Sequence, residues 1–316
     1  MEASITRRRA FAIIAGLGAS AAGIRSVDAR TLEWRGTALG ADATFIFANS
    51  DPMRARAALS ECFAEIERLE RIFSLHLRSS EISRLNAEGT LDRPSLDMLT
   101  LLGECRRLHR LTEGLFDPTV QVIWDYWNGR NDAAPQRDEV FSHVLAHVGF
   151  DAIEIAPERI TLPVGSAITL NGIAQGYITD RAADFLRTRG WRDVLVDLGE
   201  ARALDGCTFD VAVRGDGPTI PLSNMALATS SSAPLASGAD GRRPHVFDPR
   251  TGAAVPRLWE TVSVMHASAT VADGLSTALL LAATGDADPA RRILARVPGA
   301  RAWIRRRGGD NLVIGA

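Results

Sequence analysis

Lysine is absent from this chain of 316 residues, so all 36 basic side chains are arginine. This absence excludes catalysis through a lysine Schiff base, a serine–lysine dyad and the lysine of a phosphate-binding loop. No G-x-G-x-x-G motif follows a predicted strand, so a nucleotide would not be held in the Rossmann manner. The formal net charge is −2, and the arginines are dispersed along the chain. Nucleic acid is therefore not an expected partner.

Cysteine is scarce and long hydrophobic runs are missing from most of the chain. Cys62, Cys105 and Cys207 are an odd number without the spacing of a metal site. Two of them lie in helical patterns with apolar neighbours, which predicts buried free thiols. The hydrophobic share of 46% is ordinary for a folded soluble protein.

The first 29 residues resemble an export signal. Arg7, Arg8 and Arg9 precede the small apolar run at 12–23, and residues 27–29 resemble a signal cleavage site. A membrane anchor is the alternative, but the run is short for spanning a bilayer and rich in alanine and glycine. The pattern predicts twin-arginine export to the periplasm without stable membrane insertion, followed by one domain over residues 30–316.

Hydrophobic periodicity predicts an α+β fold. Alternation over 32–48 predicts a strand or hairpin, and Asp51 with Pro52 opens a helix as cap and first position. Irregular order of strands and helices argues against a doubly wound sheet. Further strands are expected at 153–155, 160–162, 167–170, 194–198, 209–213, 225–228, 262–265, 302–304 and 312–314, and helices at 80–86, 95–111, 173–189, 271–283 and 289–296.

Residues 245–252 combine a base, a carboxylate and an anion-binding arginine in one predicted turn. Pro249 presets its own φ and favours an extended Asp248, while Gly252 permits a sharp reversal. His245 could take up a proton near neutral pH, with Asp248 or Arg250 orienting groups around it. The alternative is that His245 is a hydrogen-bonded turn residue.

A second candidate site combines two distant segments. Asp273 and Thr277 share one face of a predicted helix, and their oxygen atoms suit a hard cation such as Mg²⁺. Gly172 and Gly176 flank a helix start, where the dipole favours an anion and nearby carbonyls can ligate a cation. The sequence therefore predicts a cation and phosphate site. As alternatives, Asp273 is favoured by the helix dipole and Thr277 bonds back to its own helix.

Two further patterns have a plainer interpretation. His143 and His147 are four residues apart, but without a supporting carboxylate metal binding is not the favoured interpretation. Residues 214–216 are expected to form a turn and nothing more.

Taken in order, these motifs resemble the ApbE family, the flavin transferases that attach FMN to proteins with FAD as donor. The similarity is collinear over residues 34–284. Its motifs lie at 73–74, 80–86, 116–119, 172–177 with Asp180, 196–199, 228–230, 245–252 and 272–278.

The resemblance implies a T-fold-like α+β architecture with FAD in a cleft and Mg²⁺ on its pyrophosphate. It implies that Asp273, Thr277 and the Gly172 carbonyl ligate the metal, and that Asp273 and His245 act in catalysis. A threonine or serine hydroxyl of an acceptor protein would attack the FMN phosphorus and release AMP. The implied FAD contacts are Leu39, His76, Leu115, Phe116, Asp117, Thr169, Gln175 and Phe247.

Several positions depart from the family pattern. Leu39 stands where methionine is frequent, His76 where tyrosine is usual, Thr169 where aspartate is usual and Gln175 where lysine or glutamate is common. None of these departures affects the implied metal ligands, and a histidine can still stack on a ring. They leave two alternatives open, an FAD pyrophosphatase that gives FMN and AMP, and an FAD-binding protein without turnover.

Overall fold

The computed structural model of the chain describes residues 31–39, 41–128, 139–213, 217–233, 244–256, 259–283, 287–308 and 311–315. The predicted export signal over residues 1–29 and the predicted turn at 214–216 lie outside the described residues. No helix in the described ranges combines the length and apolar character needed to cross a membrane.

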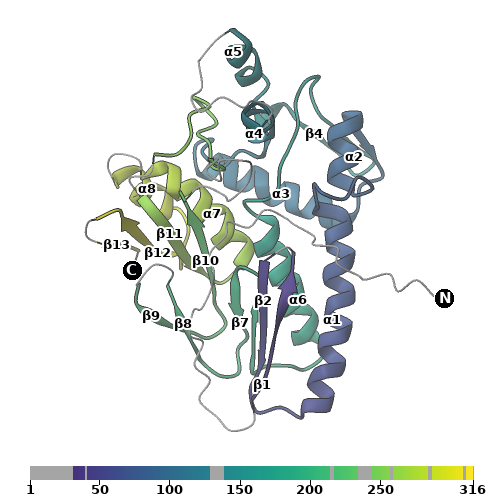
Figure 1. Cartoon of the computed structure of the whole chain (residues 1–316), viewed down its shortest axis with the longest axis vertical. Coiled ribbons are helices and arrows are strands. Elements are labelled where there is room, and N and C mark those ends of the chain that lie inside the picture. Colours follow the sequence, from purple (N-terminus) through teal and green to yellow (C-terminus); the bar gives the residue numbers. More distant parts are fainter. Residues whose placement is uncertain are drawn as a thin grey trace, which may run out of the picture.

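A large sheet in which all neighbouring strands are antiparallel forms the lower half of the molecule in Figure 1. Its strand order is β1-β2-β6-β7-β10-β11-β12-β13, so segments far apart in sequence become neighbours. The strands are β1 (Leu32–Ala38), β2 (Ala41–Phe47), β6 (Val194–Asp197), β7 (Ala201–Ala203), β10 (Ala226–Ser231), β11 (Trp259–His266), β12 (Arg301–Arg306) and β13 (Asn311–Ile314).

Helices and two smaller sheets surround the large one. The other end of the molecule holds α2 to α5 and β4, and α1 runs along one side (Figure 1). The smaller sheets are β3-β5-β4, from β3 (Thr90–Asp92), β4 (Glu154–Ile155) and β5 (Arg159–Thr161), and the hairpin of β8 (Phe209–Ala212) and β9 (Thr219–Leu222). The helices are α1 (Pro52–Phe73), α2 (Glu81–Glu88), α3 (Leu96–Leu111), α4 (Gln121–Asn128), α5 (Glu139–Leu145), α6 (Ala174–Thr188), α7 (Ala269–Ala282) and α8 (Asp288–Leu294), with short 3-10 turns at Pro118–Val120 and Phe150–Ala152.

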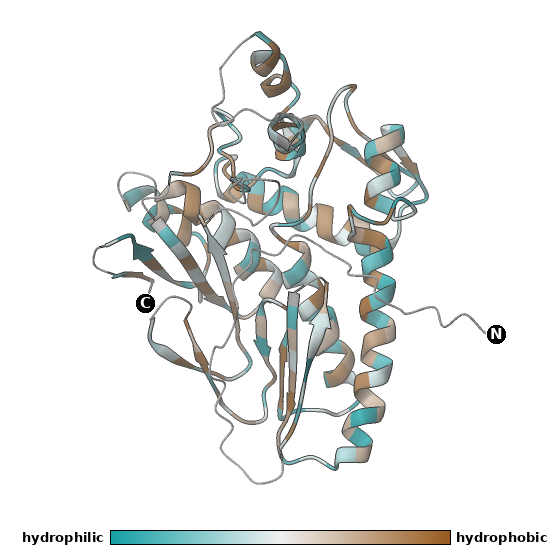
Figure 2. Cartoon of the chain, viewed as in Figure 1, coloured by the Kyte–Doolittle hydropathy of each residue, from teal (hydrophilic) through white to brown (hydrophobic). Residues whose placement is uncertain are grey.

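The large sheet buries both faces. Val262 and Val264 of β11 share one core with Leu275 of α7, whereas Leu195 and Trp303 face a second core under the β8–β9 hairpin. Every residue of α7 except Thr277 is buried. By contrast, hydrophilic and hydrophobic residues alternate along α1, as expected of a helix with one solvent-facing side (Figure 2).

Local signals predicted the helix starts well. Asp51 caps α1 by accepting a hydrogen bond from the amide of Arg54, and Ser95 caps α3 in the same way. The predicted α+β class is confirmed. All three cysteines are free, and burial raises the pKa of the Cys62 thiol to about 12.

The predicted strand at 167–170 is wrong, because this extended segment joins no sheet. Both backbone groups of Ile168 bind the side-chain amide of Asn86, each at 2.8 Å. The amide of Thr169 donates to the carbonyl of Pro118 at 2.8 Å. A side chain and a turn therefore satisfy the hydrogen bonds that a neighbouring strand would otherwise take.

Close contact between α6 and α7 depends on Gly176. A Cβ atom at this position would overlap the carbonyl oxygen of Ala269 and lie 2.7 Å from the Cβ of Asp273. We expect Gly176→Ala to lower the free energy of unfolding by roughly 1–3 kcal/mol through overpacking, measured by denaturant titration. Gly103 in α3 is the matched control, since a Cβ there meets nothing within 4 Å. Gly103→Ala should stabilise by roughly 0.5–1 kcal/mol, and equal effects of the two substitutions would contradict the packing argument.

Candidate active site

The residues predicted to bind a cation meet where α7 crosses the start of α6. A carboxylate oxygen of buried Asp273 accepts a hydrogen bond of 3.0 Å from the amide of Gly176. The hydroxyl of Thr277, one turn further along α7, lies 3.5 Å from the carbonyl oxygen of Gly172. Asp273, Thr277 and Gly172 are thus brought together, although about 100 residues separate their segments, as Thr277 and Gly172 are 105 apart.

The environment of Asp273 disfavours a negative charge unless a cation is present. Burial raises the pKa of its carboxyl to about 7, the Gly176 amide opposes this rise, and Asp180 adds to it. A buried carboxylate of this kind is stabilised by a metal ion or by further hydrogen bonds.

The donor set at this corner fits Mg²⁺ better than a softer metal. In the described part of the chain, no group of three or more His, Cys, Asp or Glu side chains could hold a metal ion. The corner instead offers one carboxylate, one hydroxyl and one carbonyl. Mg²⁺ is commonly bound by one or two carboxylates, with phosphate oxygens and water completing its shell.

Ser230 and Ser276 form a network of hydroxyl groups near this corner, which was not predicted from the sequence. The Ser230 hydroxyl at the end of β10 lies 2.7 Å from the hydroxyl of Ser276 and 3.1 Å from that of Thr277. Ser276 in turn donates to the carbonyl of Asp273 at 2.9 Å. Ser276 lies in the sequence motif at 272–278, but its contact with β10 depends on tertiary packing and has no local sequence signal.

His245 is anchored to the same strand, one residue further on. Burial lowers the pKa of its imidazole to about 4, and a hydrogen bond with the backbone of Ser231 opposes this shift. The ring is therefore neutral at pH 7 and has a free acceptor nitrogen, but the lowered pKa makes it a weaker base than the near-neutral histidine expected from the sequence. Because Ser230 contacts Thr277 and Ser231 contacts His245, the end of β10 links the predicted metal ligand with the predicted base.

The predicted turn after His245 is confirmed, but its two charged side chains, Asp248 and Arg250, pair with each other. Arg250 donates to both carboxylate oxygens of Asp248, at 3.0 and 2.7 Å, and its amide donates at 2.9 Å. Gly252 adopts a φ of +63° and closes the turn through its amide. The prediction that Asp248 or Arg250 orients groups around His245 has no support in these contacts. Phe247 is buried and its ring stacks parallel to that of Trp127.

The segment at 115–117 packs beside α7. Leu115 and Phe116 are buried, and a Cβ at position 274 would lie 3.5 Å from the Phe116 ring. The carboxylate of Asp117 accepts from the amide and hydroxyl of Thr119 and from the amide of Phe150. These three bonds hold the Asp117 carboxylate within the protein.

Three other predicted FAD residues make contacts within the protein. Thr169 binds the Pro118 carbonyl through its backbone, and buried Gln175 donates to the carbonyl of Leu198 at 3.2 Å. Leu39 has a φ of +57°, and its amide donates to Glu70 near the end of α1.

Exposed His76 follows the same end of α1. This end reaches α6 through an edge contact of Phe73 with Tyr177, with ring centroids 5.5 Å apart. Leu39 and His76 thus both lie near the end of α1 that contacts α6.

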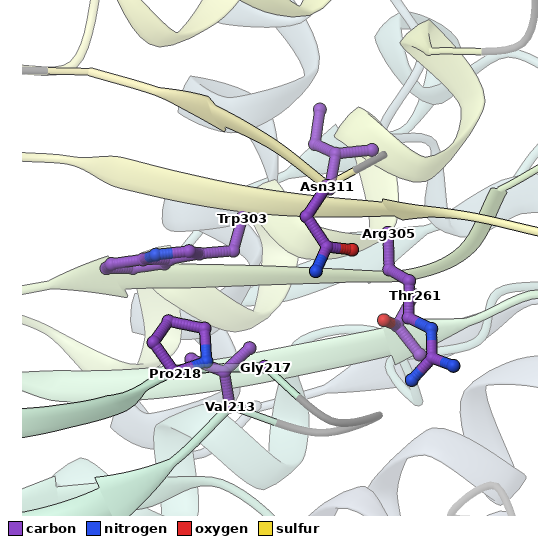
Figure 3. A pocket seen from close by; sticks show the side chains of 8 residues that line it. Val213, Gly217, Pro218, Thr261, Trp303, Arg305 and Asn311 are labelled. Carbon is purple, nitrogen blue, oxygen red and sulfur yellow. The ribbon is translucent and has the colours of Figure 1, made fainter. Parts of the chain in front are cut away.

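A separate hollow lies on the side of the second core. The side chains of Val213, Pro218, Trp303, Arg305 and Asn311 surround it (Figure 3). Its volume of about 20 Å³ holds about one water molecule. It contains none of the predicted site residues and is too small for a flavin.

The fold is that of an α+β protein, and the α6–α7 corner brings together oxygen atoms of the kind that ligate a hard cation. A model of the ApbE family matches residues 39–300, and the chain belongs to this family. The prediction from the sequence motifs is confirmed, including the class of flavin transferase.

Curated relatives and solved structures agree with this assignment. The FAD:protein FMN transferase of Haemophilus influenzae is 28% identical over 233 residues, which are 66% of this chain and 67% of the relative. That of Vibrio cholerae is 29% identical over 236 residues, 68% and 70% of the two chains. The ApbE protein of Thermotoga maritima superposes with a TM-score of 0.78 at 26% identity, covering 90% of this chain and 97% of that one. The apo flavinyl transferase ApbE of Pseudomonas stutzeri gives 0.77 at 22% identity, covering 90% and 94%, and supports the fold.

Proposed function

We propose that this chain transfers FMN from FAD to a threonine or serine hydroxyl of an acceptor protein, in a Mg²⁺-dependent reaction that releases AMP. The observation that carries the proposal is the meeting of Asp273, Thr277 and the Gly172 carbonyl at the start of α6. The names of the curated relatives, FAD:protein FMN transferase, support the donor and the kind of acceptor.

In this proposal, one set of residues neutralises charge and another accepts the proton. Mg²⁺ held by Asp273, Thr277 and Gly172 would neutralise charge on the pyrophosphate. The positive dipole end of α6 would add favourable charge at a phosphate group bound there. Neutral His245 takes the proton as the acceptor oxygen forms its bond to the FMN phosphorus. The bond between that phosphorus and the bridging oxygen breaks, and AMP leaves with this oxygen.

Incubation with an acceptor protein tests the proposal directly. The purified chain, FAD, Mg²⁺ and an acceptor with a flavinylation motif should give a fluorescent acceptor band. An acceptor with its modified threonine or serine changed to alanine should give none. Release of AMP at a comparable rate without acceptor would indicate an FAD pyrophosphatase instead. FAD that stays bound and intact with Mg²⁺ would indicate a binding protein without turnover.

The Ser230 hydroxyl is expected to strengthen Mg²⁺ binding at the proposed cation site. We expect Ser230→Ala to raise the Mg²⁺ concentration for half-maximal activity up to about tenfold, since one hydrogen bond contributes roughly 0.5–1.5 kcal/mol. Ser231→Ala is the matched control, because its hydroxyl instead donates to the carbonyl of Glu260 at 3.0 Å. Mg²⁺ titration of both variants is the measurement, and an equal shift in both would contradict the role of Ser230.

We also propose that residues 1–29 direct export to the periplasm by the twin-arginine route. The support is the arginine run at 7–9 ahead of a short apolar segment. Cell fractionation of the full chain should find it in the periplasm. Joint Arg8→Lys and Arg9→Lys substitution should retain it in the cytoplasm, and unchanged export would rule out this route.

A further inference from the structure

The rings of His143 and His147 converge on the surface beside α5. His143 lies in the last turns of α5, and His147 follows four residues later in the segment after the helix. Their Nε2 atoms are 3.4 Å apart, with the ring planes at 90° and the centroids at 4.8 Å. His143 is exposed and His147 is partly exposed.

The two nitrogens make a long hydrogen bond, and their separation also suits a shared metal ion. Nitrogen donors form hydrogen bonds mostly at 2.7–3.2 Å, so 3.4 Å between two nitrogens is long. Two imidazoles that each ligate Zn²⁺ at about 2.0–2.1 Å with a tetrahedral angle place their nitrogens about 3.4 Å apart. We propose that His143 and His147 form a surface site for a divalent transition metal of the zinc class, with water completing its coordination.

The position of His147 is fixed by contacts from outside its own segment. A Cβ atom at Gly165 would lie 2.6–2.9 Å from three atoms of the His147 ring, so the ring rests on bare backbone. The carbonyl of His147 accepts a hydrogen bond of 2.9 Å from the hydroxyl of Ser166. One ligand is thus held in place before a metal ion arrives, which lowers the entropy lost on binding.

The metal ion would stiffen α5 against segments at the proposed FAD site. Two residues after His147, the amide of Gly149 donates to the Thr119 hydroxyl at 2.8 Å. Phe141 of α5 shares a hydrophobic cluster with Phe247 and packs on Gly252. A link between His143 and His147 would therefore tie the helix, which already packs on 247–252 through Phe141, to the segment that binds Thr119. Its role is structural, and the site is separate from the oxygen ligands on α7.

Calorimetric titration with Zn²⁺ in excess Mg²⁺ tests the site on the full chain. We expect one Zn²⁺ per chain, and at least about tenfold weaker binding in His143→Gln and in His147→Gln, because each loses one of two protein ligands. His76→Gln is the matched control, as another exposed histidine, and should bind as the parent does.

Two further measurements separate this site from others. Asp273→Asn should leave Zn²⁺ binding unchanged, since it alters only the site on α7. Zn²⁺ should raise the melting temperature of the parent but not of the two glutamine variants. Absence of binding at millimolar Zn²⁺, or equal binding by the parent and both variants, would overturn the proposal.

Discussion

Replacing Asp273 with alanine is expected to abolish transfer of FMN, with a loss of roughly 10³-fold or more in turnover. Asp273 is the single carboxylate of the predicted cation site, and metal stabilisation of a developing phosphoryl charge contributes several kcal/mol. AMP release and acceptor fluorescence are the measurements. Mg²⁺ far above its normal requirement should not restore activity, because the remaining ligands are a hydroxyl and a carbonyl.

Asp273→Asn separates loss of the cation site from loss of the fold. The amide keeps the volume of the side chain and an oxygen that can accept from Gly176. Burial raises the pKa of Asp273 to about 7 in the metal-free protein. Its contribution to stability is therefore present below the unfolded value of about 4 and is lost as the pH rises through about 7. The asparagine variant should lack this loss and remain folded at pH 8, yet be inactive. Turnover within tenfold of the parent would contradict the assigned role.

The sequence pointed to Asp273, Thr277 and Gly172, which meet at the start of α6, but it left their partners open. Asp273 is the fifth residue of α7, and its carboxylate binds the amide of Gly176 on another helix. Asp273 therefore lies beyond the first turn of its own helix, and its carboxylate is at the first turn of α6 instead. For Thr277, the hydroxyl reaches Gly172 and Ser230, while Ser276 makes the bond back to its own helix. The spacing of four residues predicted the shared face but could not name the partners across it.

Prediction succeeded where short-range rules decide the structure. Capping side chains and apolar spacing fixed the helix starts at Asp51 and Ser95. It failed at 167–170, where Asn86 from a distant helix binds the backbone. It also missed α4 and β7, which are only eight and three residues long and so give a short window for any sequence pattern. The packing of α7 against β10 brings the hydroxyl groups of the network together. No local sequence pattern encodes this tertiary contact.

Replacing His245 with alanine is expected to spare FAD binding while turnover falls roughly 10²–10⁴-fold, the range for loss of a general base. FAD binding is measured by quenching of flavin fluorescence, and transfer by single-turnover kinetics with acceptor. The imidazole is hydrogen-bonded to the backbone of Ser231, whereas the predicted metal ligands lie on α7 and before α6. Loss of tight FAD binding in the variant would mean that His245 binds FAD rather than accepting the proton.

The pH dependence distinguishes His245 as a base from an ordinary surface histidine. Burial lowers its pKa to about 4, so the neutral ring persists well below the ordinary value of 6.5. The stability it contributes is present above 6.5 and is lost as the pH falls through about 4. If the ring accepts the proton, the acid limb of kcat/KM should lie near its folded pKa and disappear in His245→Ala. Added imidazole should then partly restore the rate of this variant. An acid limb that persists unchanged in His245→Ala would assign proton transfer to another group.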